Sequence, residues 1–132
     1  EVGVPEIRLT NRTRARAEAL RHDFGAKITV VDWVQSAHVL DDAATVVNTT
    51  ALGMIGKPEF NVSLTELNPK ALVNDLVYTP IQTEFLTAAA ARGCKTVDGL
   101  GMLLHQAAPG FERWFGHRPE VDEETRDTVM GL

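Results

Sequence analysis

Residues 7–17, IRLTNRTRARA, change their pattern of apolar side chains half-way along. Residues 7–10 alternate apolar and polar side chains, as a β-strand does, whereas Ala17, Leu20 and Phe24 recur at the spacing of a helix. A strand that leads directly into a helix is the unit from which parallel sheets are built. This stretch therefore predicts the start of an α/β protein.

The same alternation of strand and helix continues to the end of the chain. The expected strands cover residues 6–10, 28–31, 45–48, 71–77 and 95–97, and the expected helices cover residues 14–24, 83–92 and 100–115, with a last short helix from about residue 122. Residues 36–42 favour a single helical turn, and residues 52–60 favour a loop. Such an order predicts a mainly parallel sheet with helices on both faces.

Composition excludes several classes of protein. The 132 residues suit one domain, and the net charge of −5 argues against a nucleic-acid partner. The single cysteine, Cys94, excludes an internal disulfide framework, and the four histidines show no metal-ligand spacing, so we expect no metal site. The apolar runs are too short for a membrane span, and no leader opens the chain. We therefore expect a cytoplasmic protein with no membrane partner.

In a parallel sheet, ligands bind beyond the carboxyl ends of the strands. The residues that follow the expected strands are therefore the candidates: 11–13, 48–50, 75–78 and 98–99. In the third segment, Asp75 is expected to orient the backbone at the strand's end, with a general base as the alternative.

Arg12, Arg14 and Arg16 lie at the expected start of the helix 14–24, where Thr13 is a candidate cap. Cations in a first turn oppose the helix dipole, so this cluster favours a bound anion held by guanidinium groups and helix amides. The alternative is a solvated basic face. In a dinucleotide-binding fold, an arginine after the second strand accommodates the 2′-phosphate of NADP, and the uncharged Asn11 followed by Arg12 favours that phosphate over NAD.

Five segments together resemble the shikimate dehydrogenase family. They are Asn11-Arg12-Thr13-x-x-Arg16-Ala17, Val47-Asn48-Thr49-Thr50-Ala51-Leu52-Gly53-Met54, Asp75-x-Val77-Tyr78-x-Pro80-x-x-Thr83, Asp98-Gly99-Leu100-Gly101-Met102-Leu103 and His105-Gln106-Ala107-Ala108 with Trp114 behind it. Each segment alone is weak, but their shared order makes the match specific. The resemblance implies a Rossmann-like three-layer fold.

The resemblance also implies a role for individual residues. Asn11, Arg12, Thr13 and Arg16 would hold the adenosine ribose and its 2′-phosphate, with Arg14 in the same anion site. Thr49 and Thr50 would line the middle of the cofactor. Leu76, Gly99 and Met102 would contact the nicotinamide end, the glycine because a bare backbone lets the carboxamide approach. Tyr78 and Gln106 would bind the hydroxyls and carboxylate of shikimate; taken singly, they also fit a half-buried strand-end aromatic and an exposed glutamine.

The spacing in residues 100–115 agrees with this assignment. Leu100, Leu103, Ala107, Phe111 and Trp114 form one apolar stripe, which we expect in the core. Met102 and Gln106 lie four residues apart on another face, which we expect to border a cleft.

The implied function is the reversible, NADPH-dependent reduction of 3-dehydroshikimate to shikimate, a step of aromatic amino-acid biosynthesis. Residues 1–132 would be a partial NADP-binding domain that lacks the family's first strand, its glycine-rich loop and the substrate domain with the catalytic residues, so the chain alone would be inactive. Residues 1–4 would be the tail of the helix after that loop. The protein would be a monomer or homodimer. The alternatives are a quinate/shikimate dehydrogenase relative and a non-catalytic module that senses NADP(H).

Overall fold

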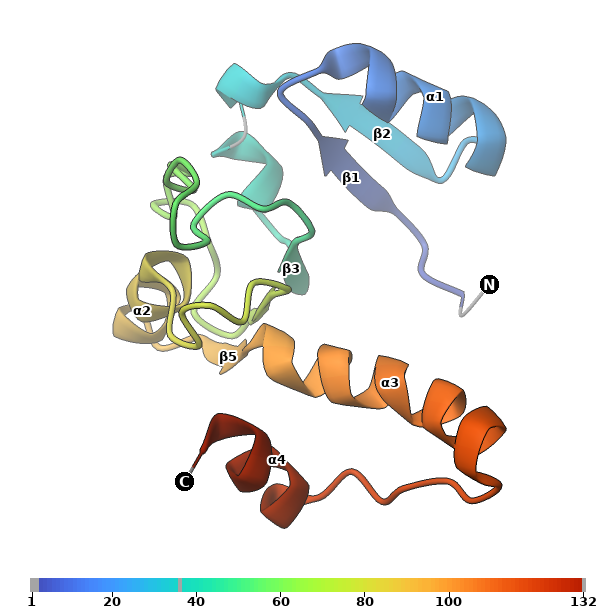
Figure 1. Ribbon diagram of the computed structural model, residues 1–132. Coiled ribbons are helices and arrows are strands. Elements are labelled where there is room, and N and C mark those ends of the chain that lie inside the picture. The colour runs from blue at the N-terminus through green and yellow to red at the C-terminus, as the bar shows by residue number, and fades with distance from the viewer. Residues whose placement is uncertain (1–2, 36, 132) are drawn as a thin grey trace. The chain divides into compact units, whose positions relative to one another are not determined.

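The alternation of strands and helices is present in the structure, a computed structural model that describes residues 3–35 and 37–131. The chain forms two compact units, described here one at a time (Figure 1). Unit 1 comprises residues 1–44 and 61–68, and unit 2 comprises residues 45–60 and 69–132.

Unit 1 is a strand–helix–strand unit followed by two short 3₁₀ turns. Strand β1 (Ile7–Thr10) leads into helix α1 (Arg14–Phe24) and then into β2 (Ile28–Val31), which pairs with β1 in parallel. The turns η1 (Trp33–Gln35) and η2 (His38–Leu40) follow. The expected helical turn in residues 36–42 is therefore present as η2, and Ser36 lies outside the described residues. The apolar core of this unit consists of Ala17, Ile28, Val39, Leu40, Leu64 and Leu67.

Unit 2 contains the remaining strands and helices. Strands β3 (Thr45–Asn48), β4 (Leu72–Asp75) and β5 (Lys95–Val97) form a parallel sheet in that order. Helices α2 (Glu84–Ala91), α3 (Gly99–Phe115) and α4 (Glu123–Met130) complete it. Its most deeply buried apolar side chains are those of Ala71, Val73, Val77, Phe85, Leu86, Ala89, Leu100 and Ala108.

All strand pairs in the described residues are parallel, as expected, and they divide between two sheets. Strand β4 is shorter than the expected 71–77, because the backbone leaves the ladder once the N–H of Leu76 has bonded to β3. There the N–H of Leu76 donates to the carbonyl of Asn48, and the N–H of Val77 donates to the Asp75 carboxylate. The prediction of a helical tail in residues 1–4 is wrong for Gly3 and Val4, which are not helical; Glu1 and Val2 lie outside the described residues.

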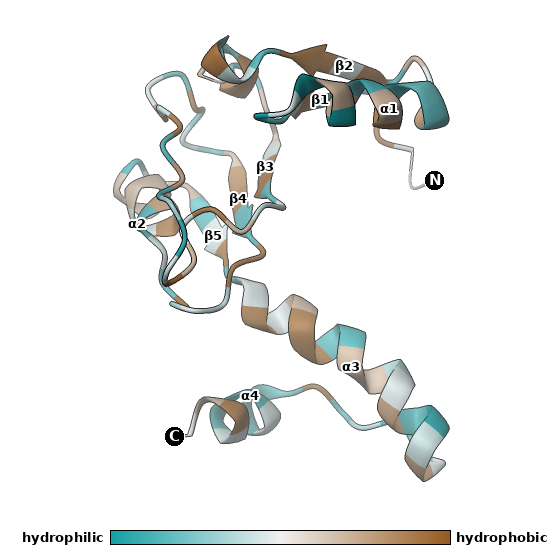
Figure 2. Cartoon of the chain, turned by 45° about the horizontal axis from the view of Figure 1, so that its top comes forward, coloured by the Kyte–Doolittle hydropathy of each residue, from teal (hydrophilic) through white to brown (hydrophobic). Residues whose placement is uncertain are grey.

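Helix α3 departs from the prediction in what it buries. Leu100 is buried and Leu103 and Phe111 are half-buried, but Ala107 is exposed and Trp114 keeps 80% of its surface accessible. Apolar residues recur along the whole helix in Figure 2. The prediction that the stripe is core is therefore wrong for its second half, because periodicity shows which residues share a face but not what covers that face.

None of the helices in the described residues is long and apolar enough to cross a membrane.

Candidate functional site

The turn between β1 and α1 is shaped by Asn11. Its side-chain oxygen accepts a hydrogen bond from the backbone N–H of Thr13 at 2.8 Å. Thr13 occupies the position before the first turn of α1, but its hydroxyl makes no capping hydrogen bond. The expectation that the Thr13 hydroxyl caps the helix is therefore wrong. The hydrogen bond at this turn is instead the one in which the Asn11 side chain accepts from the backbone N–H of Thr13.

The three arginines near this turn are not equivalent. Arg14 pairs with Asp32, which follows β2, and with Glu18 one helical turn on at 3.0 Å. The hydrogen bond to Asp32, and after it the one to Glu18, raises the pKa of the Arg14 guanidinium above its ordinary value. The donors of Arg14 are thus engaged by carboxylates of this chain, although the sequence groups Arg14 with Arg12 and Arg16.

The guanidinium groups of Arg12 and Arg16 remain exposed and have no hydrogen-bond or ion-pair partner among residues 3–35 and 37–131. The first turn of α1 also contains no acidic residue. Two unpaired guanidinium groups beside helix amides form a donor set suited to an anion with several oxygens, such as a phosphate. The donors present here therefore fit the 2′-phosphate that NADP carries and NAD lacks.

In unit 2, a buried polar network joins the carboxyl ends of β3 and β4. One oxygen of the fully buried Asp75 accepts from the Asn48 amide and from the Val77 backbone N–H, both at 3.0 Å. Its other oxygen accepts from the Thr83 hydroxyl at 2.7 Å. Thr83 in turn caps α2 by accepting from the N–H of Leu86. Asp75 therefore orients the strand end, as expected, and in addition the start of α2, and its oxygens are occupied in doing so.

Asn48 extends this network into the loop that follows β3. Its side-chain oxygen accepts from the backbone N–H and the hydroxyl of Thr50, at 3.0 and 2.8 Å. Its NH₂ group also donates to the carbonyl of Leu52. The Thr50 hydroxyl accepts from the N–H of Leu52 as well, so it shapes the loop, whereas Thr49 is exposed.

Helix α3 begins in close contact with the segment after β4. The N–H of Gly99 donates to the carbonyl of Val77, and a Cβ added at Gly99 would overlap the carbonyl of Leu76 and lie 2.7 Å from that of Val77. The structure thus gives a reason for glycine here other than approach of a carboxamide, namely close contact with this chain's own backbone. Leu76 and Gly99, both expected at the nicotinamide end, are brought together.

The other residues expected at this end also lie in unit 2. Tyr78 lies two residues after Leu76, in the segment that follows β4. Met102 and Gln106 lie one turn apart on α3. The side chains of Tyr78, Met102 and Gln106 are all exposed. An exposed surface of this kind is available to a ligand or to another part of a protein.

Sequence reasoning missed one part of this region. Arg126 on α4 holds Asp98 with two hydrogen bonds, of 3.2 and 2.6 Å. Asp98 also caps α3 by accepting from the N–H of Leu100 at 3.0 Å. The sequence predicts only a short helix from about residue 122, and its one hint of this pairing is that Arg126 is the single cation within α4.

The part of the chain that the structure describes contains no group of three or more His, Cys, Asp or Glu side chains placed to hold a metal ion.

The sequence has close relatives among known proteins. Residues 99–123 match the family model described as the shikimate 5′-dehydrogenase C-terminal domain. A shikimate dehydrogenase (NADP(+)) of Cereibacter sphaeroides strain KD131 is 73% identical over 98% of this chain and 47% of that protein. A protein of the same name from Paracoccus denitrificans is 62% identical, over 98% of this chain and 46% of that protein. The chain thus spans about half the length of these relatives.

Solved structures give the same result for the fold. Quinate dehydrogenase from Corynebacterium glutamicum in complex with NAD has a TM-score of 0.86 and 34% identity, over 98% of this chain and 48% of that one. Shikimate 5-dehydrogenase from Thermus thermophilus in complex with NADP(H) and shikimate has a TM-score of 0.72 and 33% identity, over 87% of this chain and 42% of that one. The resemblance to shikimate dehydrogenases and the Rossmann-like α/β fold are confirmed.

Proposed function

We propose that this chain is the NADP-binding portion of a shikimate dehydrogenase, the family that its sequence relatives represent. The observation that carries the proposal is the pair of guanidinium groups of Arg12 and Arg16 beside the first turn of α1, which are exposed and have no partner in the described residues. Relatives that are 73% and 62% identical carry NADP(+) in their names. The proposed reaction is the reversible reduction of 3-dehydroshikimate to shikimate.

The residues of unit 1 would select the cofactor. Arg12 and Arg16 would donate charged hydrogen bonds to the 2′-phosphate, and the Asn11 turn would support the adenosine ribose. Arg14, held by Asp32 and Glu18, would take a smaller share and stiffen the turn. The sequence alone assigns all three arginines to the anion. In this proposal Arg12 and Arg16 bind it, and Arg14 mainly supports the turn.

The residues of unit 2 would orient the two reactants. Thr49 and Thr50 would line the middle of the cofactor, and Leu76, Gly99 and Met102 would border the nicotinamide end. Tyr78 and Gln106 would bind the hydroxyls and carboxylate of the substrate. When bound, the cofactor supplies or accepts the hydride. No residue of this chain is assigned as the proton donor.

The test measures shikimate oxidation by the full-length protein that contains this sequence, with NADP and with NAD, for the wild type and for Arg12→Ala. We expect the wild type to prefer NADP. Loss of one charged hydrogen bond should lower kcat/KM for NADP by roughly 10- to 100-fold. Turnover with NAD should change little, because NAD carries no 2′-phosphate.

Arg21→Ala is the matched control. Arg21 lies in the last turn of the same helix, with its nearest carboxylate, that of Glu18, 3.8 Å away. This variant should keep the wild-type preference. Equal use of NADP and NAD by the wild type would contradict the role of the arginines while leaving the enzyme assignment in place.

A second function is supported by the quinate dehydrogenase structure, which was solved with NAD and aligns over 98% of this chain. It requires faster turnover with quinate and NAD than with shikimate and NADP. Binding of NADP without turnover of either substrate would instead favour the sensing module.

A further inference from the structure

Arg126 and Asp98 form a bidentate ion pair within unit 2. The two terminal nitrogens of Arg126 donate to the two oxygens of Asp98, at 3.2 and 2.6 Å. The side chains keep only 27% and 22% of their surface exposed. Two parallel bonds fix the relative orientation of the groups as well as their distance. The fork therefore ties α4 to the first residue before α3, 28 positions earlier in the sequence.

Asp98, held in this orientation, also binds the start of α3. The oxygen that accepts from Arg126 at 3.2 Å also accepts from the N–H of Leu100 at 3.0 Å. The next residue, Gly99, has no room for a side chain against the carbonyls of Leu76 and Val77. A rotation of the Asp98 carboxylate would therefore disturb both the first turn of α3 and its contact with the segment after β4.

We infer that Arg126 is a positioning residue for the reaction proposed above: by holding Asp98, it fixes the start of α3 and thereby the places of Met102 and Gln106. This inference rests on the proposed function, which assigns Met102 to the nicotinamide end and Gln106 to the substrate. Arg126 itself touches neither reactant in this account. Its effect is transmitted by Asp98.

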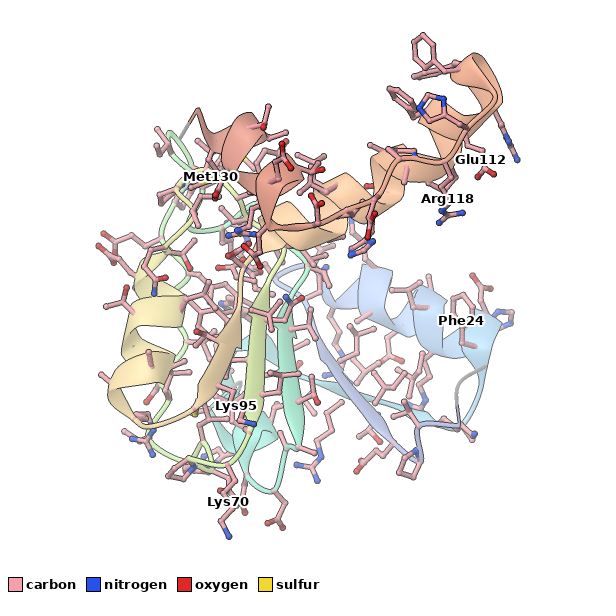
Figure 3. The ribbon with its side chains drawn as sticks, turned by 90° about the horizontal axis from the view of Figure 1, so that it is seen from below. Phe24, Lys70, Lys95, Glu112, Arg118 and Met130 are labelled. Atoms are coloured by element: carbon pink, nitrogen blue, oxygen red, sulfur yellow. The ribbon has the colours of Figure 1, made fainter. Side chains whose placement is uncertain are left out.

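The chain offers a control in Arg118, which follows α3. Arg118 forms one contact with Glu112, at 3.5 Å, and the two side chains are 59% and 48% exposed. Both are labelled near the end of α3 in Figure 3. A single exposed pair of this kind contributes little to structure, because solvent screens the charges and the side chains keep their freedom.

The kinetic experiment compares Arg126→Gln with Arg118→Gln in the full-length protein. Misplacing a positioned group by a fraction of an ångström to 1 Å costs roughly 10- to 100-fold in rate. We expect Arg126→Gln to lower kcat/KM for shikimate by that factor, while the preference for NADP over NAD stays at the wild-type value. Arg118→Gln should leave both quantities unchanged.

Two further variants separate positioning from general damage. Asp98→Asn keeps an oxygen that can accept from Leu100 but loses the charge that Arg126 pairs with, so it should reproduce the effect of Arg126→Gln. The double variant should then be no worse than either single one, because both remove the same interaction. Arg126→Lys, which keeps the charge without the fork, should recover part of the activity.

Hydrogen exchange supplies a readout that does not depend on turnover. In Arg126→Gln the backbone amides of residues 100–103 should exchange faster than in the wild type, and those of α2 should not. Unchanged kcat/KM for shikimate, or additive losses in the double variant, would overturn the inference while the wild type remains active. A wild type without shikimate turnover would instead remove the proposed function, and the inference with it.

Discussion

Gly99 and Gly101 lie two residues apart in the first turn of α3, in very different surroundings. A Cβ at Gly99 would overlap the backbone carbonyl of Leu76, whereas a Cβ at Gly101 would have no heavy atom within 4 Å, its own helix's backbone apart. The first glycine is therefore required by packing, whereas nothing packed around the second requires a glycine.

This contrast gives a prediction with an internal control. Gly99→Ala should lower the free energy of unfolding by about 1–3 kcal/mol, because the backbone after β4 must move. Gly101→Ala should be neutral or should raise it by up to about 1 kcal/mol, because alanine favours helix. Urea denaturation followed by circular dichroism measures both; equal effects of the two substitutions would contradict the close contact.

Sequence reasoning at the scale of residues succeeded where an interaction is local. The role of Asp75 at the strand's end follows from its position, and the structure confirms it with three hydrogen bonds. The Thr13 hydroxyl caps no N–H, and the N–H of Arg16 in the first turn donates to the Thr13 carbonyl instead. The pairing of Arg126 with Asp98 could not be predicted, because no local pattern connects residues 28 apart.

Among the elements, α4 is the one whose stability depends most on the hydrogen bonds at its ends. None of its residues is buried, so packing contributes little to its stability. At its start, the Asp122 carboxylate accepts from the N–H of Thr125 at 2.8 Å. This bond, and after it a bond with the Thr125 side chain, lowers the pKa of Asp122 below its ordinary value.

The lowered pKa makes the capping interaction dependent on pH. Because the folded form binds a proton less readily than the unfolded form, the stabilisation is complete above the ordinary pKa and is lost as pH falls through the folded value. Asp122→Ala should therefore destabilise α4 at pH 7, and its difference from the wild type should shrink below about pH 4.

Amide exchange of α4, measured at both pH values, tests this expectation. Asp127→Ala is the control, because Asp127 lies on the same helix and caps no N–H at its start. A difference between the wild type and Asp122→Ala that is as large at low pH as at pH 7 would contradict the account of the cap.

The boundaries of most elements could be predicted because strands alternate with period two and helices end at glycines. Helix α1 ends before Gly25, and β5 covers the expected 95–97. Sequence periodicity was a poorer guide to which residues of α3 are buried. Trp114 shares the apolar stripe with Leu100, yet only Leu100 is covered by the rest of the described chain.

At the scale of the whole molecule, the parallel direction of the strands follows from the alternation of elements, but the grouping of segments does not. Residues 61–68 return to unit 1 after the chain has formed β3 and its loop in unit 2. Their buried side chains, Leu64 and Leu67, carry no sequence signal for that return. Long-range grouping depends on complementary surfaces, which periodicity does not encode.

The candidate site shows the same limit. The residues after β1, β3, β4 and β5 could be selected because ligands bind at the carboxyl ends of parallel strands. Which of their side chains lack a partner within the described chain could not be predicted. Arg12 and Arg16 are distinguished from Arg14 only by the carboxylates of Asp32 and Glu18, and the first of these lies 18 residues away.

The most direct test of the central claim measures the affinity of the full-length protein for adenosine 2′,5′-bisphosphate and for adenosine 5′-monophosphate by calorimetry. We expect the wild type to bind the bisphosphate roughly 10- to 100-fold more tightly, with Arg12→Ala removing most of that difference and Arg21→Ala preserving it. Equal affinity of the wild type for the two nucleotides would contradict a 2′-phosphate site at Arg12 and Arg16.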